Sequence, residues 1–180
     1  IGTDELKFVW RSEAEYSLDE EEFETLENQF RLATPISPFF DAIAGIRIET
    51  PEGNDRIDGV VGIHGLAQQW IEVDADLFVS EDPSIRLEAE YEGLITNQIT
   101  FTPSIEIEIP LTDDRSRGFG NFAPIIEIGA RLSYDLIDRA VSPYSGVHYE
   151  FATGESGSLA HAAGGNKDEF FFVVGSRFIF

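Results

Sequence analysis

Apolar and polar residues alternate along most of the chain with a period of two. Over residues 71–80, Ile, Val, Ala and Leu occupy the odd positions, and most of the even positions are acidic or polar. The pattern resumes over 85–92 and again over 99–109. Successive side chains of a strand point to opposite sides of a sheet, so this alternation predicts strands with one apolar and one polar face.

Seven further segments fit the same pattern, which gives ten predicted strands of about ten residues, the length that a tilted strand needs to cross a bilayer. The seven are residues 5–15, 24–35, 39–49, 57–67, 123–134, 142–151 and 170–180. Segment 24–35 is the weakest of them. The acidic stretch before it, with Phe23, Leu26 and Phe30 at helix-like spacing, is also compatible with a short helix.

The connections between these segments alternate in length. Short turns are expected near 35–39, 68–69, 96–98 and 137–142, and longer polar connections at 16–23, 50–56, 80–84, 110–122 and 152–169, the last rich in Gly and Ser. Outer-membrane barrels have short periplasmic turns and longer outer loops. We therefore predict an all-β fold, a closed antiparallel up-and-down transmembrane barrel of about ten strands, with both termini on the periplasmic side.

The alternative is a soluble β-sandwich or lipocalin-like barrel, in which the apolar face points inward. Ionic side chains in the middle of the strands favour the membrane barrel, in which the polar face points inward. An Arg facing lipid at the bilayer centre would cost about 2–4 kcal/mol, so the arginines are expected on this inner face. Aromatic residues near strand ends, such as Trp10 and Trp70, are typical of the interfacial girdles of membrane barrels. Six arginines fall on the polar face: Arg11, Arg31, Arg47, Arg86, Arg131 and Arg177.

Composition narrows the possible partners. The chain has 34 acidic and 12 basic residues and a formal charge of −22, which argues against nucleic acid, because phosphate binding requires clustered Lys and Arg. Cys and Met are absent, so disulfides, thiolate sites and thioether ligands are excluded. The length fits one domain, residues 1–180. We expect a monomer in a bacterial outer membrane, with the lipid bilayer and metal cations as partners.

The acidic stripe on the polar face is the candidate site. Counting from the turns places His64, Asp74 and Glu90 at similar heights on three consecutive strands, with Glu72 nearby and His148 level with them across the lumen. Imidazole with carboxylates suits Cu(II) or Zn(II), so these five residues are candidate metal ligands. The alternative is a salt-bridge network, with Arg86, Arg131 and Arg177 as partners of the acids, because close carboxylates must be protonated, paired or neutralised.

The chain contains the runs GIHGLA (62–67), WIEVDA (70–75), RLEAEY (86–91) and PYSGV (143–147), and these resemble the copper resistance protein B family. Its last residues, VGSRFIF (174–180), resemble the aromatic-terminated last strand of outer-membrane barrels in general. The resemblance covers residues 39–180 well and 1–38 more loosely. It implies an outer-membrane protein that binds or exports copper ions and contributes to copper resistance. Members of that family usually carry a Met- and His-rich segment ahead of the barrel, and this sequence shows none.

We therefore expect a binding or ion-transport protein whose acidic lumen holds or guides copper ions, and we expect no enzymatic activity. Two alternatives stay open. One is a structural or adhesion barrel without metal chemistry, acting through loops 110–122 and 152–169. The other is an outer-membrane protease, which requires a His beside an acid pair at the outer mouth.

Overall fold

The computed structural model describes residues 6–17, 23–51, 56–113, 119–136, 140–162 and 168–178, and over them the chain forms a closed antiparallel barrel. The predicted ten-stranded barrel is confirmed. Its long strands are β1 (Lys7–Ser17), β2 (Phe23–Pro35), β3 (Phe40–Pro51), β4 (Arg56–Leu66), β5 (Ile71–Val79), β6 (Ser84–Tyr91), β8 (Ile99–Pro110), β9 (Ile125–Tyr134), β10 (Val141–Ala152) and β11 (Asp168–Phe178). The described residues also include a two-residue strand, β7 (Gly93–Leu94), a single 3-10 turn (Gln68–Trp70) and one helix, α1 (Gly154–Ala162).

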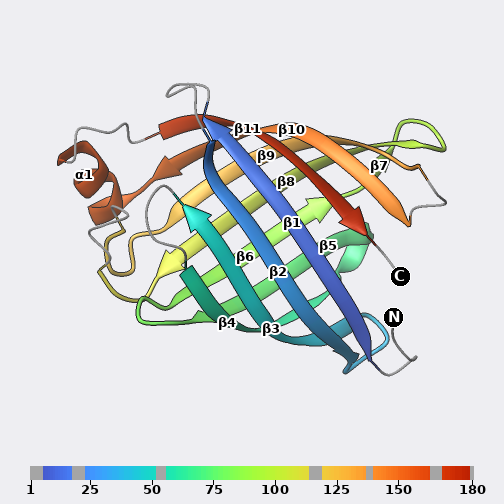
Figure 1. Cartoon of the computed structure of the whole chain (residues 1–180), viewed down its shortest axis with the longest axis horizontal. Coiled ribbons are helices and arrows are strands. Elements are labelled where there is room, and N and C mark those ends of the chain that lie inside the picture. The colour runs from blue at the N-terminus through green and yellow to red at the C-terminus, as the bar shows by residue number, and fades with distance from the viewer. Residues whose placement is uncertain are drawn as a thin grey trace.

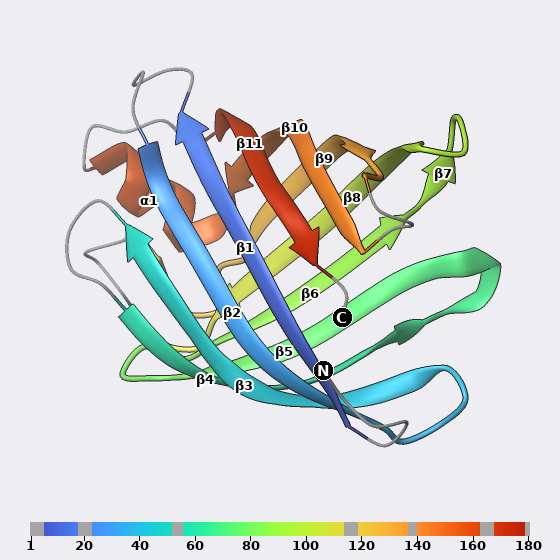
Figure 2. The same cartoon turned by 45° about the vertical axis from the view of Figure 1, so that its right-hand side comes forward.

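Consecutive long strands pair antiparallel all the way round the ring. The ring is completed by the pairing of β1 with β11, and β6 pairs with β8 across the hairpin that carries β7. Figure 1 shows the strands running diagonally across the barrel, and Figure 2 shows the front wall of β1 to β3 set against the far wall. A closed ring leaves no unpaired strand edge.

The two ends of the barrel differ. The turns β2–β3, β4–β5, β6–β8 and β9–β10 share one end with the start of β1 and the finish of β11, and we call this the terminus end. The connections β5–β6, β8–β9 and β10–β11 lie at the other end, the loop end, which also carries α1 (Figure 1).

Helix α1 corrects the prediction of a plain Gly- and Ser-rich loop over 152–169. Its sequence, GESGSLAHA, contains two Gly and two Ser, which are weak helix formers, so local propensity does not predict it. Tertiary contacts hold it instead. The buried Ser156 hydroxyl accepts a hydrogen bond from the Gly120 amide at 2.9 Å and donates one to the Ala123 carbonyl at 2.8 Å.

The alternative of a short helix over Phe23, Leu26 and Phe30 is wrong, because these residues lie within β2, which pairs with β1 and β3. The Phe30 ring stacks on Trp10 of β1, with ring centroids 6.1 Å apart. Pairing with two neighbours satisfies most of the backbone of β2, with one register shift against β1 between Glu15 and Tyr16, and this outweighs the weak local helix pattern. Residues 18–22 of the preceding acidic stretch lie outside the described part of the chain.

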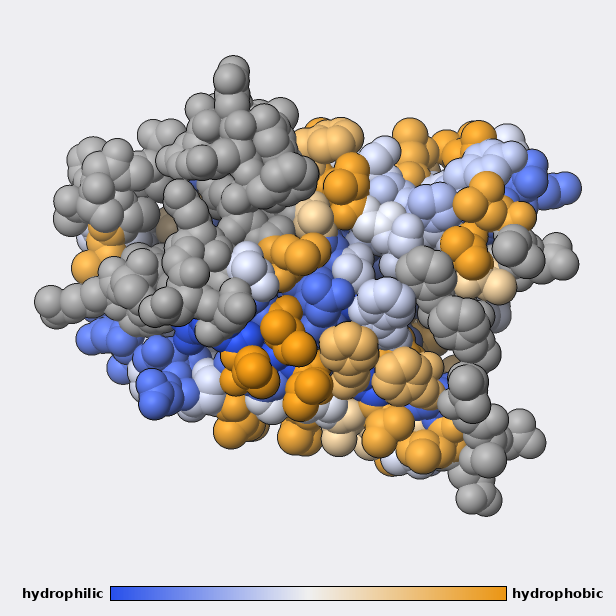
Figure 3. All heavy atoms as spheres, viewed as in Figure 1, coloured by the Kyte–Doolittle hydropathy of each residue, from blue (hydrophilic) through white to orange (hydrophobic). Residues whose placement is uncertain are grey.

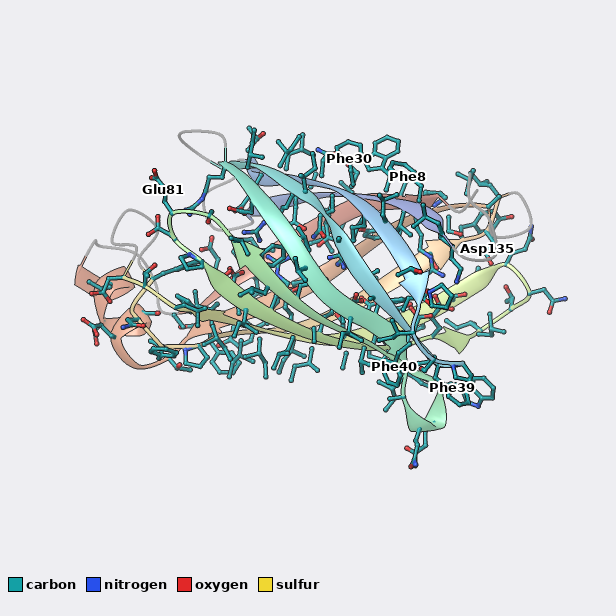
Figure 4. The ribbon with its side chains drawn as sticks, turned by 90° about the horizontal axis from the view of Figure 1, so that it is seen from below. Phe8, Phe30, Phe39, Phe40, Glu81 and Asp135 are labelled. Carbon is teal, nitrogen blue, oxygen red and sulfur yellow. The ribbon has the colours of Figure 1, made fainter. Side chains whose placement is uncertain are left out.

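The two faces of the barrel are opposite in character. Apolar residues cover much of the outside, where Ile128 and Leu132 are half exposed. Figure 3 shows apolar side chains, in orange, gathered on the face that it displays. In Figure 4, Phe8 and Phe30 point away from the barrel, and nitrogen and oxygen atoms gather between its walls. The six arginines lie on the inner face, as predicted, where ion pairs hold them. Among the described helices, none has the length and apolar character needed to cross a membrane.

The apolar outer band yields the first prediction. Ile128→Arg places a charge in the middle of β9 on the outer face, and we expect it to lower the free energy of unfolding in liposomes by about 2–4 kcal/mol. Ile57→Arg is the matched control, since Ile57 is also outward and exposed but lies at the end of β4, where an Arg costs about 0–1 kcal/mol. Equal losses in denaturant titrations of the two variants would contradict an outer face against lipid.

Candidate functional site

Ion pairs join opposite walls of the barrel. Arg11 of β1 donates two hydrogen bonds to the carboxylate of Glu88 on β6, at 2.7 and 3.1 Å, and these strands lie five places apart in the ring of ten. Arg177 of β11 donates to Glu92 at 2.8 Å and lies 4.0 Å from Glu72 of β5, which is again the opposite strand. These side chains therefore cross the lumen.

Other arginines each serve several acids. Arg86 of β6 pairs with Glu27 at 3.2 Å, Glu106 at 2.9 Å and Glu108 at 3.2 Å. Arg31 pairs with Asp74 at 3.2 Å and Asp76 at 2.6 Å, and Arg131 pairs with Glu13 and Glu90. The salt-bridge network expected around Arg86, Arg131 and Arg177 is present, and Arg11 and Arg31 extend it.

A cavity of about 360 Å³ occupies the lumen on the terminus side of this network, and we call it the vestibule. Lys7 and Arg177 line it and are about half exposed, so it is in contact with solvent. Its carboxylates outnumber its cations, seven to five. The carboxylates belong to Asp41, Glu72, Asp74, Glu88, Glu90, Glu92 and Asp135, and the cations to Lys7, Arg11, Arg31, Arg131 and Arg177.

His64 and Asp74 form the pair in the vestibule best suited to a metal ion. They are direct cross-strand neighbours on β4 and β5, and His64 Nδ1 lies 3.1 Å from Asp74 Oδ2. The described residues give the imidazole ring this one side-chain partner, so Nε2 is available to another ligand. The His64 side chain is 39% exposed and lines the vestibule, so an ion from solvent can reach it.

Glu72 and Glu90 line the same vestibule but lie two residue pairs away from Asp74. They are partners of each other across β5 and β6, whereas Asp74 is paired with Glu88. The register therefore corrects the expected alignment of Asp74 with Glu90 by two residues. The contact of Glu90 with Arg131 draws this carboxylate into the salt-bridge network.

His148 lies apart from the other four candidates. It does not line the vestibule, its side chain is 3% exposed, and its Nδ1 contacts Glu127 on the neighbouring strand. Its ring packs on Gly129, where an added Cβ would lie 2.7 Å from His148 Nε2. Of the five predicted ligands, the structure brings together His64, Glu72, Asp74 and Glu90 and separates His148.

The arrangement suits loose rather than tight metal binding. Among the described residues, no group of three or more His, Asp or Glu side chains is positioned to hold a metal ion. Imidazole nitrogen is a donor that Cu(II) accepts, and His64 offers Nε2, whereas the carboxylate of Asp74 is engaged at Nδ1 on the other side of the ring. The remaining coordination positions would be left to water.

Sequence reasoning missed the pairing of Arg11 with Glu88. Alternation placed both residues on the polar face, but they lie 77 residues apart in the chain and no local pattern links them. Phe78 was also missed, although it had a visible signal. It occupies an even position of β5, where the acids Glu72, Asp74 and Asp76 predict a polar residue.

Comparison with known proteins gives a family and a fold. The family described as Copper resistance protein B precursor matches residues 1–180. Copper resistance protein B of Escherichia coli is 33% identical over 182 residues, and the Copper resistance protein B homolog of Pseudomonas syringae pv. tomato is 29% identical. The whole chain aligns with each of these curated relatives but spans only 60% and 61% of their lengths.

Among solved structures, the NanC porin in a rhombohedral crystal form matches with a TM-score of 0.60. The match covers 95% of this chain and 100% of the porin chain at 12% sequence identity. At that identity the likeness shows the barrel fold alone.

The cross-lumen network yields the second prediction. Arg11→Ala leaves Glu88 buried without its main partner, and we expect it to lower the free energy of unfolding by about 3–5 kcal/mol. Lys7→Ala is the control, because the Lys7–Asp41 pair has a similar N–O distance, 3.2 Å, but Lys7 is largely exposed, and such pairs contribute about 0.2–1 kcal/mol. Denaturant titration in detergent measures both, and equal losses would show that burial of the pair is unimportant.

Proposed function

The chain belongs to the copper resistance protein B family, and on that premise we propose that it is an outer-membrane barrel that takes copper ions into its vestibule and so contributes to copper resistance. The observation that carries the proposal is the His64–Asp74 pair, which lies within an acid-rich cavity in contact with solvent.

An outer-membrane location is supported by the distribution of side chains on the barrel. Exposed apolar residues cover the outside, the ring has no free strand edge, and the arginines of the strands lie inside. This inverted arrangement is typical of barrels that contact lipid. The porin-like fold agrees with it.

The charge of the vestibule favours cations. Its carboxylates exceed its cationic side chains, and a cleft with an excess of one sign of charge raises the local concentration of the opposite ions. Asp74 also orients the His64 ring by binding Nδ1, which directs Nε2 to a metal, as carboxylates beside metal-binding histidines commonly do. The vestibule would thus attract copper ions by charge and bind them at His64 Nε2, with Asp74 holding the imidazole ring in place.

The low number of protein ligands suits copper as a cargo. A closed site with four protein ligands retains its metal, whereas a single His with water in the other positions releases it more readily. We propose that the barrel binds copper reversibly, acts without enzymatic chemistry of its own, and passes the ion on.

A purely structural barrel is the competing function, and the salt-bridge network favours it. Most lumen acids contact arginines, which leaves fewer of them for cations. The two functions differ in one measurable property, because a purely structural barrel would release no heat of saturable copper binding in a calorimetric titration.

The third prediction tests this difference. Calorimetric titration of the detergent-purified chain with Cu(II) should show saturable binding, and His64→Ala should weaken it at least about tenfold, because it removes the imidazole ligand. His148→Ala is the matched control. It removes a second histidine that lies outside the vestibule, so affinity should change little.

Three results would count against the proposed site. If the parent protein released no heat on titration with Cu(II), the proposal of copper binding would be wrong. Equal losses in the two variants would show that His64 has no special role. Binding of Ca(II) as strong as that of Cu(II) would indicate a carboxylate site without imidazole.

A further inference from the structure

On the loop side of the vestibule, buried side chains of the described residues occupy the lumen. Phe78, Val173 and Val60 lie on the inner face of their strands. Phe78 and Val173 are completely buried and Val60 is 1% exposed, so other side chains, not solvent, surround them. Among the described residues, the lining of the vestibule includes neither Phe78 nor the arginines beside it. The cavity therefore ends within the barrel and does not cross it.

The ring of Phe78 contacts the guanidinium groups of two arginines. The guanidinium carbon of Arg47 lies 3.7 Å from the centroid of the Phe78 ring, and that of Arg86 lies 5.1 Å from it. Both distances are within the range of cation–π attraction. A phenyl ring held by two cations in the interior of a barrel has little freedom to move.

The two arginines are themselves fixed by acids on neighbouring and distant strands. Arg47 donates to Asp58 of β4 at 2.8 and 2.5 Å. Arg86 of β6 reaches Glu27 of β2 at 3.2 Å, four places away in the ring. The ring of Phe78 is therefore held by a frame that spans β2 to β6.

We propose that Phe78, with Arg47 and Arg86, forms a closure that separates the vestibule from the loop end, so that ions enter and leave the vestibule only at the terminus end until this ring moves. The inference rests on the proposed placement of the barrel in a membrane. Under that placement it gives the copper site a single side of access.

Phe78 adds an apolar group to a constriction that is otherwise made of charged side chains. Charged side chains can exchange partners with water and with passing ions, whereas apolar groups in a constriction exclude water. Val60 is the direct cross-strand partner of Phe78, so the apolar contact extends onto β4. A ten-stranded barrel is narrow enough for a few side chains to fill its cross-section.

The test is the electrical conductance of the full chain in planar lipid bilayers. The parent barrel should pass little current, and Phe78→Ala should raise single-channel conductance by at least about threefold, because it opens a gap in a lumen that side chains otherwise fill. Phe101→Ala is the matched control, since Phe101 lies on the outer face of β8 and is 40% exposed. This variant should leave conductance unchanged.

Each variant is first checked for assembly by its shift in gel migration on boiling. If Phe78→Ala does not assemble, Phe78→Leu is measured in its place, because it removes the ring with a smaller loss of volume, and a rise above the parent value is still expected. A silent, assembled Phe78→Ala barrel would overturn the closure. So would a parent barrel that conducts as well as Phe78→Ala does.

Failure of the closure and failure of the proposed function give different results. A chain that neither shifts on boiling nor inserts into bilayers contradicts the membrane placement. If the parent protein releases no heat on titration with copper but Phe78→Ala still raises conductance, copper binding is contradicted and the closure stands. If the parent protein releases heat on binding copper but Phe78→Ala leaves conductance unchanged, the closure is contradicted and copper binding stands.

Discussion

Ion pairing across a narrow lumen is the constraint on which this structure depends. A ring of ten strands turns the polar face of each strand toward one shared interior, and in this chain that face is rich in carboxylates. Close carboxylates in such a space must be protonated, paired or neutralised by a cation. Arg11, Arg31, Arg86 and Arg131 provide the pairing by reaching strands that are not their neighbours.

The same network divides the lumen into two parts with different properties. On the terminus side the acids outnumber the cations, the cavity is in contact with solvent, and His64 lies within reach of an incoming ion. On the loop side, apolar rings and buried arginines fill the space, with Phe78 held between Arg47 and Arg86. The proposed copper site and the proposed closure thus lie in separate parts of one barrel.

The family assignment and the geometry contribute different information. The family associates the chain with copper resistance, but the curated relatives are longer, and this chain spans about 60% of their length. The geometry identifies one imidazole–carboxylate pair in a solvent-connected cavity. Together they lead from a general association with copper to a specific residue, His64, whose role can be measured.

Alternation with a period of two was sufficient to predict the strands, the barrel class and the inward orientation of the arginines. These features are local: which face a side chain occupies follows from its position in the strand, and a charge cannot face lipid cheaply. Local pattern also brought His64 and Asp74 together, because they flank a short turn between adjacent strands.

Only the tertiary structure decided which charges meet and which parts of the lumen are open. The pairing of Arg11 with Glu88 depends on the diameter and closure of the ring, and no sequence pattern around either residue indicates the other. Helix α1 forms on contacts with Gly120 and Ala123, against its own propensity. The separation of His148 from the vestibule follows from register and strand tilt, which accumulate around the ring and cannot be counted from any one turn.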